Sequence, residues 1–250
     1  MGYPKGSIAL SPVYDIPMLL QVLHSQFITH GQLREFMRLG CYELNDNSFN
    51  WRVRRLVEHG FLIRQCVPAV TAELIYSIGS CGKSILADKF PIMDMGRRKD
   101  AASHMNLRHS LELNRLHLSL KYQGVLSGWQ SEMSIRARNE LTPNGFLKNY
   151  DAIVSVEVPW DMSFALKYER SPKTPKTYSR IRSLMEQELE IGVFLYVVPE
   201  RNLASLLSDC FFETTADIYI GLASEFIDSF VEMDVIEATS GKTLKITAVA

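Results

Sequence analysis

The chain has 250 residues and a formal net charge of -1, with 46% hydrophobic and 22% charged residues. This composition supports one large core or two modest ones and excludes disordered, collagen-like and coiled-coil architectures. No apolar run approaches the roughly 20 residues that cross a bilayer. The N-terminal residues lack the pattern of a signal peptide, and the four cysteines lack metal-ligand spacing. We expect a cytoplasmic protein with reduced thiols and no membrane partner.

The first hundred residues follow the order of a winged helix-turn-helix. Apolar residues recur at helical spacing in three stretches, which are residues 17–27, 32–39 and 48–60. Ser48 is the expected N-cap of the third helix, and Gly60 its end. Two β-rich runs, 61–67 and 73–78, then predict a hairpin, and a further helix is expected over 83–90. With a charged connector over 91–100, residues 1–100 form a predicted DNA-binding domain.

Residues 101–250 predict a second domain of mixed α/β type. A long amphipathic helix is expected over 103–122, and later helices over 174–190 and 202–208. β-rich runs are found at residues 129–135, 150–158, 163–169 and 192–198. Three strands followed by a helix and a strand indicate a mixed sheet with a crossover helix. The acidic segment 211–250 is expected to add one or two strands and a helix.

The third predicted helix carries the candidate DNA-binding residues. Its apolar face turns four side chains outward, wholly or in part, which are Trp51, Arg52, Arg54 and Arg55. In a helix-turn-helix protein such a helix lies in the major groove, where arginine binds guanine or phosphate. At its start, Asn47 and Asn50 can approach base edges. The alternative is a solvated helix whose arginines pair with carboxylates such as Glu58.

Acidic residues near the ends of three predicted strands suggest a divalent-metal site. Glu132 is placed on the first strand, Asp151 opens the second and Glu169 ends the third, with Lys173 close behind. Converging carboxylates hold Mg²⁺, which stabilises attack on a phosphodiester, while a lysine orients water or neutralises the phosphate. These four residues are the candidate catalytic set, and the three carboxylates are the candidate Mg²⁺ ligands. The alternative is a surface ion pair of Glu169 with Arg170.

Three segments carry a resemblance to a known family: Trp129 to Glu132, Tyr150 to Val154, and Ala165 to Thr174, the last including Glu-Arg-Ser-Pro-Lys. Together with the winged-helix start, they resemble the replication-relaxation family, which includes the MobC plasmid-mobilisation relaxases. The likeness spans residues 17 to about 200. It implies a winged helix followed by a restriction-endonuclease-like domain, and a role in recognising and relaxing supercoiled DNA at a transfer origin.

The chain departs from the family pattern at Lys167. Where the pattern has Glu-x-Glu-Arg, this sequence reads Lys167-Tyr168-Glu169-Arg170, so one carboxylate is replaced by a positive charge that weakens divalent-metal affinity. We therefore expect a duplex-DNA-binding protein of a plasmid or mobile element whose nuclease-like domain is degenerate. Two alternatives stay open. One is an active Mg²⁺-dependent nicking relaxase, and the other is a winged-helix transcriptional regulator whose second domain binds protein partners. Besides duplex DNA, other mobilisation or regulatory proteins are expected partners.

Overall fold

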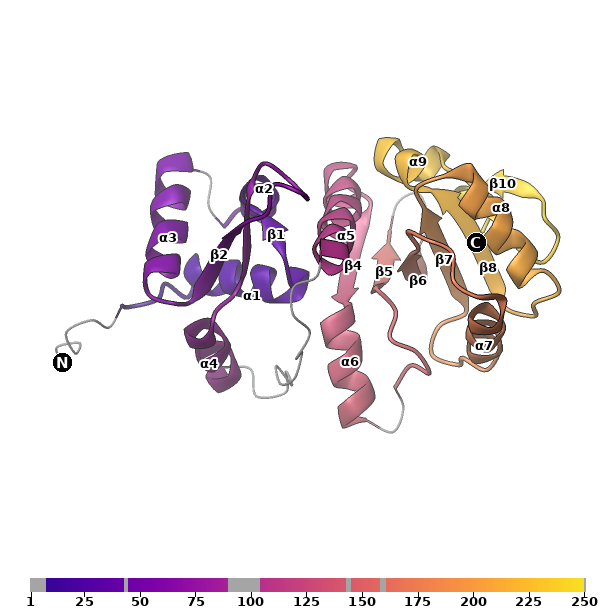
Figure 1. The fold of residues 1–250 in the computed structure, drawn as a ribbon, viewed down its shortest axis with the longest axis horizontal. Helices are drawn as coiled ribbons and strands as arrows, with labels where there is room; N and C mark the ends of the chain where they lie inside the picture. The colour runs from indigo at the N-terminus through magenta and orange to yellow at the C-terminus, as the bar shows by residue number, and fades with distance from the viewer. Residues whose placement is uncertain (1–7, 43–44, 90–103, 143–144, 158–160, 250) are drawn as a thin grey trace. The chain divides into compact units, whose positions relative to one another are not determined.

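The computed structural model describes residues 8–42, 45–89, 104–142, 145–157 and 161–249. These residues form nine α-helices, two short 3-10 helices, a three-stranded sheet and a seven-stranded sheet. Figure 1 shows the ribbon with most of these elements labelled. The expected mixture of helices and strands is confirmed. The chain divides into two compact units, Met1–Asn114 and Arg115–Ala250, and the division falls within helix α5 (His104–Tyr122). The predicted connector over 91–100 lies outside the described residues.

The first unit places a short strand between its first two helices and a hairpin after its third. Its elements before α5 are α1 (Asp15–Ser25), β1 (Ile28–Thr29), α2 (His30–Leu39), α3 (Asp46–Glu58), β2 (Leu62–Cys66), β3 (Leu74–Ile78) and α4 (Ser80–Lys89). Strand β3 lies between β1 and β2 and is antiparallel to both. The predicted helices and hairpin are confirmed. Strand β1 was not predicted, because two residues are too few to show a periodic pattern.

Side-chain caps fix where α2 and α3 begin. Thr29 and Gln32 form a capping box, in which the Thr29 hydroxyl accepts the Gln32 N–H at 3.1 Å and Gln32 Oε1 accepts the Thr29 N–H at 3.2 Å. Asn45, not the predicted Ser48, caps α3, because its Oδ1 accepts the Ser48 N–H at 3.0 Å. The helix therefore begins at Asp46, and its buried side chains are Phe49, Val53 and Leu56.

Two glycines allow the segments that follow α3 and β3 to approach each other. Gly60 adopts a φ of 72°, a left-handed conformation that favours glycine. A Cβ at Gly79 would lie 2.2 Å from the carbonyl oxygen of Gly60, which is closer than any van der Waals contact. The close passage of the two backbones therefore requires glycine at position 79.

The second unit is built on the seven-stranded sheet, whose order is β10-β9-β8-β7-β6-β5-β4. Its strands are β4 (Leu126–Ser131), β5 (Ala152–Val156), β6 (Met162–Tyr168), β7 (Val193–Val198), β8 (Asp217–Leu222), β9 (Asp234–Glu237) and β10 (Thr243–Lys245). Strands β6, β7 and β8 are parallel, and the other pairs are antiparallel. The predicted crossover is confirmed, because α7 (Pro175–Glu186) joins β6 to β7 and α8 (Arg201–Phe211) joins β7 to β8.

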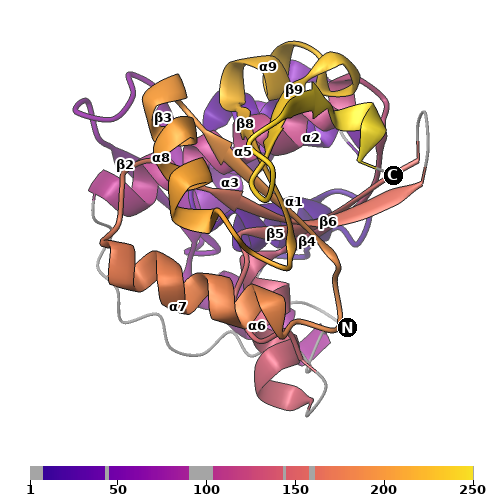
Figure 2. The same ribbon diagram turned by 90° about the vertical axis from the view of Figure 1, so that its right-hand side faces the viewer.

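Helices cover both faces of this sheet, as the view in Figure 2 shows. On one face, Tyr178 and Ile181 of α7 and Leu207 of α8 belong to a buried cluster with side chains of β7 and β8. On the other face, the ring of Phe164 in β6 stacks on Phe230, which follows α9 (Ala223–Asp228). In the described part of the chain, no helix is both long and apolar enough to span a membrane.

Glu132 does not lie on a strand, so that prediction is wrong. Strand β4 ends at Ser131, which caps helix α6 (Glu132–Leu141) by accepting the Ser134 N–H at 3.5 Å. The helix buries only Ile135 and Ala137, and so few buried apolar residues give little helical periodicity in the sequence. The segment 211–250 contains β8, α9, β9 and β10, one strand more than expected.

Candidate functional site

Helix α3 exposes part of the predicted DNA-binding set on one face. Asn47 and Asn50 are exposed, Trp51 is 46% exposed and the side chain of Arg54 is 68% exposed. Asn50 Oδ1 lies 2.9 Å from Nε2 of His30. Arg54 lies 3.8 Å from Glu58, an exposed pair one turn apart that contributes little to stability and leaves the guanidinium reachable.

The other two arginines of α3 are held by a buried carboxylate. Asp15, at the start of α1, is fully buried, and its two oxygens accept hydrogen bonds from Arg52 (3.2 Å) and Arg55. The Ser11 N–H also donates to Asp15 Oδ2 at 2.7 Å. The side chain of Arg55 is only 20% exposed, so the prediction that it faces solvent is wrong. Arg52 and Arg55 are three residues apart, on the edge of α3 nearest Asp15.

Aromatic rings support the same arginines. The guanidinium carbon of Arg52 lies 4.3 Å from the ring centroid of Tyr14, and that of Arg55 lies 4.6 Å from the ring centroid of Trp51. Such cation–π contacts fix the orientation of both partners. The contact with Arg55 therefore restricts the orientation of the Trp51 ring, which lies at the surface of α3 beside Arg54.

In the second unit, Asp151 faces Lys167 across the paired strands β5 and β6. Asp151 directly precedes β5 and is 4% exposed, and its Oδ1 lies 2.5 Å from the ammonium of Lys167. Its Oδ2 accepts the Tyr168 N–H at 2.7 Å. Burial lowers the pKa of Lys167, but the charge and hydrogen bond of Asp151, with the charges of Glu132 and Glu169, together outweigh burial and raise that pKa overall. Lys167 is thus held as a cation.

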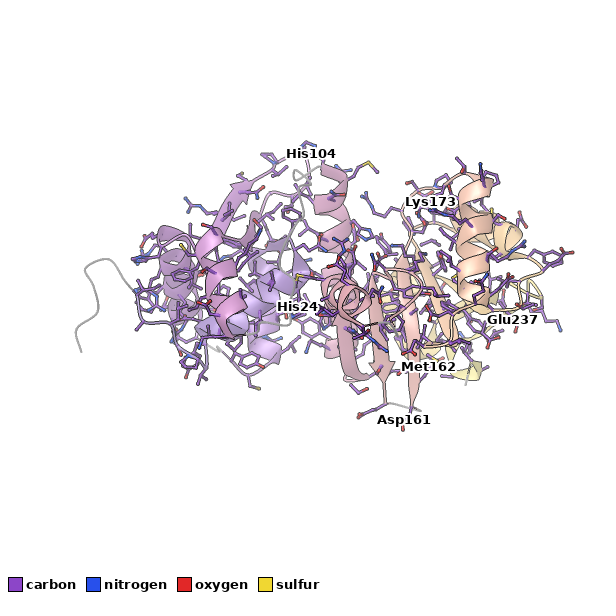
Figure 3. The ribbon with its side chains drawn as sticks, turned by 90° about the horizontal axis from the view of Figure 1, so that it is seen from below. His24, His104, Asp161, Met162, Lys173 and Glu237 are labelled. Carbon is purple, nitrogen blue, oxygen red and sulfur yellow. The ribbon has the colours of Figure 1, made fainter. Side chains whose placement is uncertain are left out.

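Glu169 and Lys173 form a second ion pair just beyond β6. Glu169 is 5% exposed and accepts a hydrogen bond from Lys173, which precedes α7 and is labelled in Figure 3. Glu132 lies at the start of α6, where it pairs with Arg136 at 3.2 Å, and its charge also raises the pKa of Lys167. The predicted carboxylates therefore share one electrostatic environment, and each of them is also paired with a cation.

These ion pairs do not fit the predicted Mg²⁺ site. Mg²⁺ binds carboxylate and water oxygens in near-octahedral geometry. Both oxygens of Asp151 are already hydrogen-bonded, and Lys173 holds Glu169. Within the ranges that the structure describes, no group of three or more His, Cys, Asp or Glu residues is arranged to hold a metal ion. A metal at this position would have to displace two ammonium groups.

Lys148 is a site residue that sequence reasoning missed. Its ammonium donates to the hydroxyl of Tyr196 at 3.3 Å and lies 5.7 Å from the ring centroids of both Tyr150 and Tyr196. Burial, then repulsion by Lys167, lowers the pKa of Lys148 to about 7. It lies in the irregular segment before β5, where no periodic pattern shows which way a side chain points.

We call Lys148, Lys167, Lys173, Asp151 and Glu169 the lysine cluster. Each of the other four charges shifts the pKa of Lys148, which shows that the five groups act on one another. The phenols at its border are neutral, since burial raises the pKa of Tyr196 and of Tyr178. The cluster therefore contains three lysines and two carboxylates.

Comparisons of the chain with protein-family models, with curated proteins and with solved structures find no match.

Proposed function

We propose that the chain is a duplex-DNA-binding protein whose first unit is a winged helix-turn-helix. The order of α1, β1, α2, α3 and the hairpin β2–β3, with β3 central in the sheet, supports this assignment. In that class of fold the third helix enters the major groove. Helix α3 has a buried apolar face and an opposite face free to meet DNA.

The observation that carries the proposal is the exposed face of α3. Asn47, Asn50, Trp51 and Arg54 lie within about a third of the helix circumference, since the helix turns about 100° per residue. Amide and guanidinium groups are the donors and acceptors that read adenine and guanine edges. Arg54 is the most exposed arginine of α3. We therefore assign to Arg54 the main arginine contact with DNA, which the sequence predicts for Arg52, Arg54 and Arg55 together.

The second unit is proposed to be a restriction-endonuclease-like domain that does not cleave. The order α5, β4, β5, β6, α7, β7 supports the resemblance, with α6 as an added helix between β4 and β5. The ion pairs at Asp151 and Glu169 support the absence of metal-dependent cleavage. The setting on a plasmid or mobile element, with mobilisation or regulatory proteins as further partners, rests on the resemblance alone.

Fluorescence anisotropy with labelled duplex DNA tests this function. We expect the full chain to bind duplex DNA, and Arg54→Ala to weaken binding by about 1–3 kcal/mol if Arg54 contacts a base. Arg201→Ala, which removes an exposed arginine at the start of α8, is the matched control and should bind like the wild type. Equal affinity of Arg54→Ala and the wild type would remove α3 from the interface.

A further inference from the structure

The lysine cluster contains one more positive charge than its carboxylates neutralise. Asp151 pairs with Lys167, and Glu169 pairs with Lys173. Lys148 has no carboxylate of its own among its described contacts, which are a phenol oxygen and two aromatic rings. When Lys148 is protonated, the cluster therefore carries a net charge of about one positive unit.

The charges around Lys148 are mixed. Burial is the main cause of its lowered pKa; repulsion by Lys167 and Lys173 adds to that effect, and attraction by Asp151 and Glu169 opposes it. A negative charge placed beside Lys148 would stabilise its protonated form. The unpaired ammonium would instead repel an arriving Mg²⁺.

Each of the three lysine side chains is partly exposed to solvent. The side chain of Lys173 is 37% exposed and that of Lys167 is 20% exposed, while Lys148 is half-buried. The carboxylates are almost fully covered. Anything that approaches the cluster from solvent therefore meets lysines before it meets carboxylates.

We infer that the lysine cluster is a phosphate-binding subsite for the backbone of a nucleic acid and not a cation site. The two carboxylates hold Lys167 and Lys173 in place, and Lys148 supplies the charge that the ligand neutralises. Phosphate suits this arrangement because its several oxygens accept charge-assisted hydrogen bonds from more than one ammonium group. The assignment to a nucleic-acid backbone rests on the DNA-binding function proposed above, whereas phosphate binding itself does not use α3 and can be tested separately.

Titration calorimetry of the full chain at low ionic strength, with inorganic phosphate and separately with MgCl₂, tests the subsite. We expect phosphate to bind the wild type and Mg²⁺ to give no binding signal. Lys148→Met should weaken phosphate binding about tenfold or more, because a charge-assisted bond is lost. This variant should fold, because exchanging a half-buried charge for an apolar side chain of similar length is often neutral or stabilising, and a thermal melt checks it.

Two controls make the result decisive. Lys242→Met removes an exposed lysine in the turn before β10, at the other end of the sheet, and should bind phosphate like the wild type. Lys148→Arg keeps the charge and should retain most of the affinity. Binding of Mg²⁺ by the wild type, or a Lys148→Met variant that binds phosphate normally, would overturn the inference.

A second arm identifies the source of the phosphate. For duplex DNA, each phosphate contact adds about 0.9 to the slope of log affinity against log salt concentration. Lys148→Met should lower that slope by about one unit if the ligand is the DNA backbone. An unchanged slope, with phosphate binding lost, would overturn the assignment to nucleic acid and point to a free phosphate compound.

Discussion

The ammonium of Lys167 lies 2.5 Å from Oδ1 of Asp151, so a fixed cation already holds the carboxylate that the sequence suggested as a metal ligand. Ala152, which follows Asp151, pairs with Leu166, which precedes Lys167. Asp151 and Lys167 therefore face each other across β5 and β6. The lysine at position 167 thereby neutralises the carboxylate of Asp151.

Mg²⁺ should not convert this protein into a nickase. With the wild type and Mg²⁺, supercoiled plasmid should stay supercoiled on an agarose gel, because an ammonium within about 4 Å of the carboxylate competes with the metal for the same charge. Lys167→Glu removes that ammonium and supplies an acid. Open circles formed only by Lys167→Glu would identify a decayed metal site, whereas open circles formed by the wild type would refute the non-cleaving assignment.

Asp15 should be far more important for stability than for DNA contact. Asp15→Ala leaves Arg52 and Arg55 without their carboxylate, and breaking a buried ion pair costs about 3–5 kcal/mol. Both arginines retain some exposure, so the lower end of this range is expected, measured as the free energy of unfolding in urea. Glu58→Ala breaks an exposed pair on the same helix and should change stability by less than about 1 kcal/mol. Equal losses for the two variants would contradict the role given to Asp15.

Lys148 should make stability depend on pH in a defined window. Its pKa is about 7 in the folded chain and 10.5 as the ordinary value, so the unfolded chain binds more protons between these limits. The free energy of unfolding therefore rises with pH from about 7 towards 10. The charges facing Lys148 are Lys167, Lys173, Asp151 and Glu169.

Lys148→Met removes this contribution, so the stability advantage of the variant over the wild type should shrink as pH rises from 6.5 to 9. Urea unfolding at several pH values measures it. Burial raises the pKa values of Cys210 and the buried tyrosines, so above pH 9 these groups lower the free energy of unfolding as pH rises. The comparison therefore ends at pH 9. If the free energies of unfolding of the two proteins change with pH in parallel, burial does not lower the pKa of Lys148.

Gly79→Ala should destabilise the first unit, because its Cβ would lie 2.2 Å from the Gly60 carbonyl oxygen and one backbone would have to move. Overpacking of this kind costs about 1–3 kcal/mol. Gly192→Ala is the matched control, since nothing lies within 4 Å of its Cβ position. Equal melting temperatures of the two variants would contradict the close approach of the Gly60 and Gly79 backbones.

The sequence predicts those elements whose pattern is local. The helix over 103–122 shows recurring leucines, the strands on either side of α7 are β-rich runs, and the structure confirms all three elements. Helix α6 was missed, since its short apolar stripe gives a weak signal and the preceding β-rich run continues into it. A capping serine at position 131 is the one local sign of its start.

The site could be predicted only in part, because pairing between distant residues leaves no local pattern. Asp151 and Glu169 were found from their places at strand ends. The burial of Arg55 depends on Asp15, which lies 40 residues earlier, and the role of Lys148 depends on Tyr196, which lies 48 residues later. A helical projection of α3 alone therefore gave Arg55 the wrong environment.

Hydrogen–deuterium exchange of the full chain, with and without duplex DNA at low salt, tests the central claim most directly. Nonspecific duplex suffices, because phosphate contacts alone support binding at low ionic strength. The account predicts slower exchange in the peptides that cover α3, Asp46–Glu58, when DNA is present. Unchanged exchange over α3 under conditions where anisotropy shows bound DNA would contradict the assignment of α3 as the DNA-binding helix.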